Sequence, residues 1–252
     1  MSLVTGGFII AAAFLTAAIS GVFGMAGGLM LKGALALVLP VSATFVAHGL
    51  FQLVANGSRA VIHRQHVDLK IVGLFALGSF VIAGLVGFIA VEPTRATLYL
   101  FMGLVPFLVW LPDRWVRLDA QRPLQALICG VSVTGVNLTA GVAGPFLDIF
   151  FVKTALTRHQ IVATKAATQV FSHIMKIVVY GAPLLAVHGK GLPPLWVFAV
   201  AVPLSMLGTS LGGLVLDRLS DVNFKRYLRL ILTVIGIAYL GQAARLYLTG
   251  AP

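Results

Sequence analysis

The chain has 252 residues, of which 59% are hydrophobic and only 10% are charged, and its formal net charge is +11. A soluble domain carries about 25% charged residues, so this composition excludes a globular protein with a fully water-facing surface. The net charge alone would suit a nucleic-acid partner. In a membrane protein it more often reflects basic cytoplasmic loops, so we expect no nucleic acid.

Several apolar runs reach the roughly 20 residues that cross a bilayer as a helix. They lack the alternation of β-barrel strands, so the sequence predicts an all-α, polytopic helical membrane protein. The first run has neither a charged n-region nor a cleavage pattern, and we expect it to belong to the mature structure. The expected elements are, in chain order, an apolar run over Leu3–Phe23, a glycine break at Gly24–Gly28, a short apolar run over Leu29–Leu39, a helix over Ser42–His63, spans over Ile71–Ala90 and Thr94–Leu111, a polar linker, a run over Leu124–Ala140 entering a second glycine turn, and helices over Thr157–Tyr180, Leu195–Val215 and Tyr227–Leu248.

One pattern occurs twice, at an offset of 117 residues (141 − 24). Each copy has a glycine turn, a short apolar run and then a helix with a polar stripe. A glycine-interrupted apolar segment at corresponding positions of two halves points to the binding site of a transporter. We therefore expect a first transmembrane repeat at residues 1–112, a polar cytoplasmic linker at 113–123 and a second repeat at 124–252. The offset aligns Gly24 with Gly141, Gly27 with Gly144, Gln52 with Gln169, Asn56 with His173, and Arg59 with Lys176.

Loop charge favours one orientation. If each glycine-containing segment enters the membrane and returns, 11 Lys and Arg residues fall on one side and 3 on the other; with plain crossings the split is 7 to 7. Because cytoplasmic loops collect Lys and Arg, we expect two inverted repeats, each a Gly-tipped hairpin plus three transmembrane helices, with both termini outside. The sequence does not separate re-entrant hairpins from pairs of short tilted spans. The cytoplasmic set is Arg64, Lys70, Arg114, Arg117, Arg122, Lys153, Arg158, Arg218, Lys225, Arg226 and Arg229, against Arg95, Lys190 and Arg245.

Inverted hairpins would bring the two glycine tips together near the midplane. Non-helical backbone at that depth must be buried in protein or line a wet cavity. A helix is expected to start after each tip, at Leu29 and at Pro145, and its free N–H groups and positive dipole end suit an anion. The alternative is that these glycines only let helices pack closely. The tip residues are Gly24, Gly27, Gly28, Gly141 and Gly144.

Two helices carry polar stripes at the spacing i, i+4, i+8, i+11, which places the polar residues on one face. Ionisable residues inside a membrane helix usually face a polar interior or pathway. Arg59 and Lys176 lie near helix ends, and snorkelling to the headgroups is an equal alternative for these two. The stripes are His48, Gln52, Asn56 and Arg59 in the first helix and Lys165, Gln169, His173 and Lys176 in the second.

Basic residues outnumber acidic ones inside the membrane segments. Lys32 joins the three basic residues of the stripes, whereas Asp148 is the one carboxylate. An ion pair between Asp148 and Lys32 is the structural interpretation. A coupling role for Lys32, Arg59 and Asp148 is the functional one. Excess positive charge around a cavity selects anions.

Metal and enzyme chemistry find little support. His48 and His173 are potential metal ligands, but no cysteine or carboxylate cluster accompanies them. Walker, Ser-His-Asp and H-E-x-x-H patterns are absent, so we expect no catalytic residues, no metal and no cofactor.

At these residues the chain resembles the TauE/SafE family of sulfite exporters and related anion permeases. The second half fits best, with Gly141-Val-Ala-Gly144, the helix start from Arg158 to Ala163-Thr164, and then His173 and Lys176. The first half keeps its glycines but has Phe45-Val-Ala-His48 at the helix start. The chain also departs from the family pattern of three adjacent glycines and a later proline. The resemblance implies two homologous halves, sulfite, sulfoacetate or other sulfur-containing anions, and no cofactor.

Three functional hypotheses follow. The first is a secondary transporter, an exporter of a small sulfur-containing anion, in the cell inner membrane as a multi-pass protein. The second is a membrane scaffold or assembly factor whose stripes bind partner helices, and the third is a cation or metal permease. The sequence leaves open the particular anion, the direction, the coupling ion and whether the chain forms a homo-oligomer.

Overall fold

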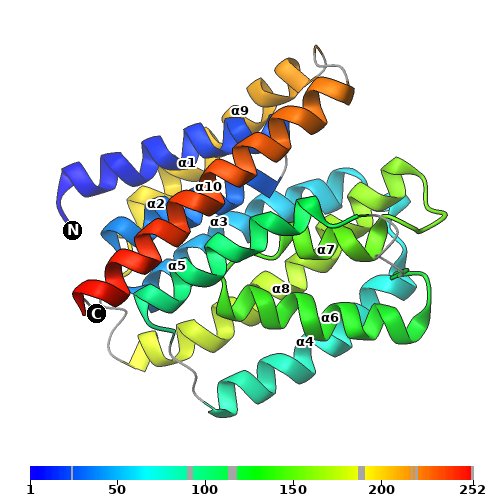
Figure 1. Ribbon diagram of the computed structural model, residues 1–252, viewed down its shortest axis with the longest axis horizontal. Coiled ribbons are helices and arrows are strands. Elements are labelled where there is room, and N and C mark those ends of the chain that lie inside the picture. Colours follow the sequence, from blue (N-terminus) through cyan, green and yellow to red (C-terminus); the bar gives the residue numbers. More distant parts are fainter. Residues whose placement is uncertain are drawn as a thin grey trace.

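The structure is a computed structural model that describes residues 1–23, 25–89, 93–112, 118–186, 191–216, 218 and 221–250. Every regular element in these residues is a helix, which confirms the predicted all-α class (Figure 1). The helices are α1 Leu3–Phe23, α2 Met25–Val38, α3 Val41–Ile62, η1 Arg64–His66, α4 Leu69–Ile89, α5 Arg95–Leu104, η2 Val105–Trp110, α6 Pro123–Thr139, α7 Gly144–Phe151, α8 Arg158–Ala186, α9 Leu195–Leu216 and α10 Asp221–Thr249.

Three boundaries differ from the prediction. Helix α2 begins at Met25, so Gly27 and Gly28 lie in its first turn rather than in a break. Helix α8 continues past Tyr180 to Ala186 with Pro183 inside it; membrane helices tolerate a proline where neighbouring groups satisfy the freed carbonyl. Helix α5 gives way to the 3-10 segment η2 at Val105, because proline at the start of η2 cannot donate the next α-helical hydrogen bond.

The helices pair across the two halves of the chain. Helix α1 packs along α9 at one flank, α4 packs along α6 at the other, and α3 lies against α8 between them (Figure 1). Under the 117-residue offset α1 corresponds to α6, and α4 to the start of α9, so the two flanking pairs are equivalents of each other. Helices α5 and α10 form a further pair.

Glycines make the flanking pairs close. A Cβ at Gly212 of α9 would lie 2.1 Å from the carbonyl oxygen of Ala18, and one at Gly130 of α6 would lie 2.1 Å from that of Phe75. Membrane helices use small residues in this way, because lipid offers no hydrophobic force to press helices together. The backbone contact therefore fixes how α1 meets α9 and how α4 meets α6.

Contacts between connections define the two ends of the bundle. At one end Arg95 donates to the carbonyl of Leu39 (3.2 Å), and Gly191 lies against Pro40. Both chain termini lie at the same end as each other in Figure 1.

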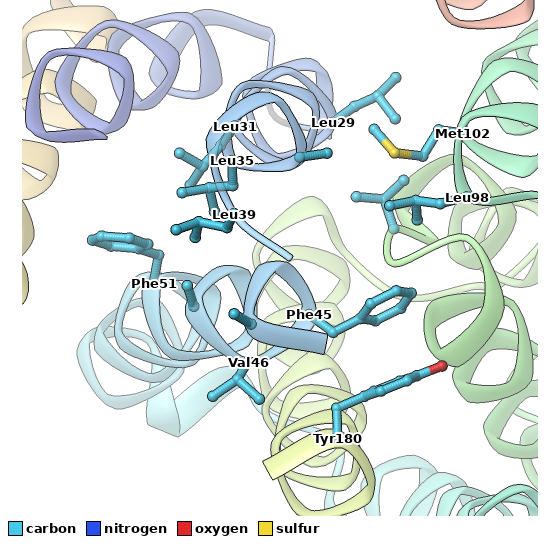
Figure 2. Packing of buried hydrophobic residues seen from close by; sticks show 14 of the residues in the cluster. Leu29, Leu31, Leu35, Leu39, Phe45, Val46, Phe51, Leu98, Met102 and Tyr180 are labelled. Carbon is cyan, nitrogen blue, oxygen red and sulfur yellow. The ribbon is translucent and has the colours of Figure 1, made fainter. Parts of the chain in front are cut away.

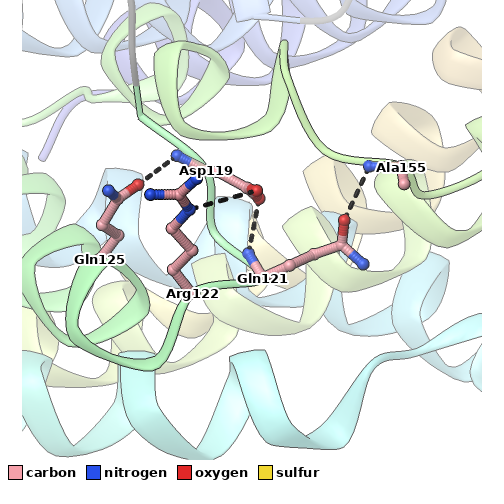
Figure 3. A network of polar contacts seen from close by, with 5 residues as sticks. All are labelled: Asp119, Gln121, Arg122, Gln125 and Ala155. Carbon is pink, nitrogen blue, oxygen red and sulfur yellow. Dashed lines mark hydrogen bonds and ion pairs between the residues drawn. The ribbon is translucent and has the colours of Figure 1, made fainter.

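At the other end, the backbone N–H of Asp68 donates to the Thr164 hydroxyl (3.0 Å), and the rings of His66 and His159 lie 5.4 Å apart. The turn before α6 joins the turn before α8, because Gln121 accepts from the N–H of Ala155 (2.7 Å; Figure 3). Segments that the charge count assigned to one side therefore lie together in space.

Among the described residues, four helices are long and apolar enough to cross a membrane. They are α1, α4, α9 and residues 226–249 of α10. Helices α3 and α8 are at least as long as α1, but they carry the polar stripes. The two helices that carry the polar stripes thus lie between the two flanking pairs.

A main hydrophobic core surrounds the join between α2 and α3. Leucines of α2, residues of α5 and the rings of Phe45 and Tyr180 meet there (Figure 2). Phe45 of α3 stacks on Tyr180 of α8 with ring centroids 4.1 Å apart, and the Tyr180 hydroxyl donates to the carbonyl of Leu138 at 2.5 Å. These contacts position the first turns of α3 against α8 and the end of α6.

Candidate functional site

Lys176 of α8 lies at the centre of a buried polar cluster. Its side chain is 0% exposed. The ammonium nitrogen lies 2.9 Å from Nδ1 of His48, 3.1 Å from Oδ1 of Asn137 and 3.0 Å from the carbonyl oxygen of Gly141. A lysine ammonium has three N–H donors, and here each has one acceptor. Burial rules out the snorkelling alternative for Lys176.

His48 joins this lysine to the first hairpin. Its Nε2 lies 3.0 Å from the carbonyl oxygen of Gly28. A carbonyl only accepts, so Nε2 carries the proton and Nδ1 accepts from Lys176; this tautomer follows from the bonding pattern. A continuous chain of hydrogen bonds thus runs from Gly28 in α2 through His48 and Lys176 to Gly141, and it joins the two glycine-containing segments.

Asn137 of α6 is a member of the cluster that the sequence reasoning missed. While Oδ1 accepts from Lys176, Nδ2 donates to Ser172 at 2.7 Å and lies 3.5 Å from Nδ1 of His173. The ring centroid of His173 is 5.9 Å from that of His48. Asn137 stands nearly alone as an amide in the apolar run before the second glycine turn, and this position was the available signal.

Lys32 of α2 is the second lysine of the cluster, and it is bonded quite differently. Its side chain is 0% exposed, and its ammonium has no hydrogen-bond partner. The nitrogen lies 3.3 Å from the centroid of the Phe45 ring, an arrangement that gives a cation–π interaction. On another side it approaches Gly141, where a Cβ would lie 2.7 Å from Nζ.

The suggested pair between Asp148 and Lys32 is wrong. Asp148 of α7 instead forms an ion pair with Lys165 of α8, and both side chains are partly exposed. Asp148 lies one turn into α7, a helix that leads from the glycine turn toward the start of α8, so it meets the first turns of α8 rather than α2. Lys165, predicted to line a substrate path, therefore has a carboxylate partner.

The remaining stripe residues continue along α3 and α8. Asn56 is buried and donates to the backbone carbonyl of Gln52 at 3.0 Å, and its amide lies 3.4 Å from Oε1 of Gln52. Gln52 also faces Gly28, where a Cβ would lie 3.3 Å from its Nε2. Gln169 and Arg59 are both partly buried.

The glycines of the two hairpins play different parts. Gly27 is a packing residue, since a Cβ there would lie 2.1 Å from the backbone oxygen of Thr16 in α1. Gly141 makes the second turn with φ of 76°, which L residues with a Cβ rarely adopt. Gly144 begins α7, with Pro145 in its first turn as expected. Gly24 lies outside the described residues.

The arrangement has a clear chemical character. Two buried lysines, Lys32 and Lys176, approach Gly141, and two histidines, His48 and His173, lie beside Lys176 in the same cluster. Among the described residues of α1 to α9, Asp148 is the one carboxylate that lies within a helix, and it is paired with Lys165. No group of three or more His, Cys, Asp or Glu side chains gathers there as a metal site, within the same described ranges.

The described residues thus form a helical bundle with four helices long and apolar enough to cross a membrane and with buried lysines in its interior, as in a multi-pass membrane protein. The comparison with protein families then gives a specific result: the model of the sulfite exporter TauE/SafE family matches residues 9–239. The chain belongs to that family, whose members are membrane transporters and not enzymes. Neither the search of curated proteins nor the search of solved structures found a match.

Proposed function

We propose that this protein is a secondary transporter that exports a small sulfur-containing anion, such as sulfite or an organosulfonate, across the cell inner membrane. Residues 1–112 and 124–252 act as two inverted repeats, joined by a cytoplasmic linker at residues 113–123. The anion binds where the two hairpins meet, between α3 and α8.

The observation that carries this proposal is the buried cluster around Gly141. Lys32 and Lys176 approach the same glycine, and no described carboxylate accompanies them. Removing a charge from water is costly, so a membrane protein retains buried lysines where they have a counter-charge or a function. A substrate anion supplies that counter-charge, whereas a cation would be repelled.

The packing of the helices supports the repeat. Equivalent pairs α1 with α9 and α4 with α6 are what a two-fold relation between the halves would give. The connections rich in Lys and Arg gather at one end, which fits a cytoplasmic face.

The membrane potential gives the direction. An inside-negative potential favours outward movement of an anion by about 2.3 kcal/mol per charge per 100 mV. Export therefore needs no coupling ion, whereas uptake would need one.

Flux measurements test the function. Purified protein in liposomes loaded with sulfite should release it when an inside-negative potential is imposed, and protein-free liposomes should not. Liposomes loaded with a monovalent or divalent cation, under an inside-positive potential that drives cations outward, serve as the second arm. Cation release without sulfite release would identify a cation permease, and release of neither by folded protein would favour the scaffold hypothesis.

A further inference from the structure

We infer that Lys32 is the residue that binds the anion directly, and that Lys176 is a positioning residue that holds the two hairpins together. This inference rests on the proposed transport function and assigns different roles to two lysines that are equally buried. The sequence stripes pointed to Lys176 as substrate-binding and left Lys32 as an ion-pair or coupling residue.

The two lysines differ in the number of N–H donors that are free. All three N–H groups of Lys176 have acceptors, namely His48, Asn137 and the carbonyl of Gly141. To bind an anion it would have to give up one of these bonds. The ammonium of Lys32 has no hydrogen-bond partner at all, so three donors are available without breaking any bond.

The contact that Lys32 does make is with an aromatic ring. Phe45 lies under the ammonium, and this ring is held by stacking on Tyr180. A cation–π contact is stronger when it is desolvated, as this one is. The ring steadies the charge when no anion is bound, but it fills none of the N–H donors.

Gly141 lies in close contact with the Lys32 amine and leaves no room for a side chain of its own. Gly141 carries no side chain, and a Cβ there would lie 2.3 Å from Cε of Lys32 and 2.7 Å from Nζ. The positive φ of this glycine also makes any other residue unfavourable. The turn therefore brings the backbone against Lys32 while its carbonyl is fixed by Lys176, so one glycine meets both lysines.

The ligand class follows from this chemistry. A compact oxyanion with several acceptor oxygens can accept from a lysine point charge without the planar geometry that arginine would impose. Sulfite and other small sulfur oxyanions have this form.

Substitution by methionine tests the division of roles, because Met has the flexible, unbranched shape of the Lys stem as far as Cε but lacks the ammonium group. Lys32→Met removes no hydrogen bond, so the variant should unfold at the same temperature as wild type or a higher one. Its affinity for sulfite, sulfate and thiosulfate, measured by thermal shift, should fall about tenfold or more, which is the loss expected for one charge-assisted hydrogen bond. Lys70→Met, at an exposed position, is the control and should match wild type in both measurements.

The folding and the anion affinity of the Lys32 variants decide whether Lys32 binds the anion. A Lys32→Met protein that binds these anions as wild type does, or that fails to fold, would overturn the inference and leave the transport function standing if wild type still moves sulfite. Lys32→Gln, which keeps a polar side chain without a charge, should lose affinity in the same way, and unchanged affinity there would also count against Lys32. If none of the anions stabilises wild-type protein, the inference fails, and the liposome flux decides separately whether the proposed function stands.

Discussion

Replacing a residue of the buried polar cluster around Lys176 leaves its hydrogen-bond partners unsatisfied, and the number of such partners differs between residues. Lys176→Met would leave three acceptors without donors: Nδ1 of His48, Oδ1 of Asn137 and the carbonyl of Gly141. An orphaned buried polar group costs about 1–3 kcal/mol, so we expect a loss of unfolding free energy of roughly 3 kcal/mol or more. Thermal unfolding of the purified protein in detergent measures this loss.

Lys153→Met is the matched control for this measurement. Lys153 is exposed after the end of α7, and its substitution should leave the unfolding temperature unchanged. If Lys176→Met unfolds at the same temperature as Lys153→Met, the three bonds contribute nothing to stability and the positioning role is refuted.

Sequence reasoning identified most members of the cluster but not their bonding. The spacing of polar residues placed His48, His173 and Lys176 on helix faces, and the structure brings these three together. Spacing along one helix cannot show which side chain meets which across helices. For this reason Asn137 was missed, and Asp148 was assigned to Lys32 instead of Lys165.

The packing between helices depends on particular glycines, and two adjacent glycines can have very different surroundings. In α9, Gly212 faces the backbone of α1, where a Cβ would lie 2.1 Å from the carbonyl oxygen of Ala18, whereas a Cβ at the adjacent Gly213 meets nothing within 4 Å. Gly212→Ala should therefore force α1 and α9 apart and lower the unfolding temperature. Gly213→Ala should be neutral or stabilising by up to about 1 kcal/mol, since alanine favours helix.

Thermal unfolding of the two variants side by side checks this prediction. Both variants replace glycine by alanine at adjacent positions of α9. A difference between their unfolding temperatures therefore reports on the contact between α1 and α9. Equal unfolding temperatures would mean that the close approach of α1 and α9 does not determine stability.

The positions of helices were more predictable than their ends. Apolar length placed α1 at Leu3–Phe23 and located the other spans, because hydropathy acts over many residues. The expected glycine break reached Gly28 and the expected helix ended at Tyr180, yet α2 already begins at Met25 and α8 continues to Ala186. Close packing explains the first, and the sequence alone does not reveal which neighbour a glycine will meet.

The two termini lie at one end of the molecule, and the connections rich in Lys and Arg lie at the other. Labelling residues at the two ends therefore tests the membrane orientation that the loop charges predict. Single cysteines at Ser2, Gln121 and Thr249, in a Cys129→Ala background, should divide into two groups. A membrane-impermeant maleimide should label Ser2→Cys and Thr249→Cys on intact cells, and Gln121→Cys only after permeabilisation.

Cys129 must be removed first, although it is buried between α4 and α6, because it is the single cysteine of the chain. Labelling of all three positions from the same side would contradict the inverted arrangement. If only Gln121→Cys is labelled on intact cells, the orientation is the opposite of the predicted one, and the linker is not cytoplasmic.

Helices of the first half pack against helices of the second half, and this also limits the order in which the chain can assemble. Thr209 of α9 reaches the carbonyl of Ala17 in α1 across 192 residues of sequence. During synthesis α1 therefore enters the membrane long before its partner exists, and α4 must likewise wait for α6. The backbone-to-backbone faces of the early helices remain against lipid or the insertion machinery until the later helices emerge, so neither half is a folding unit by itself.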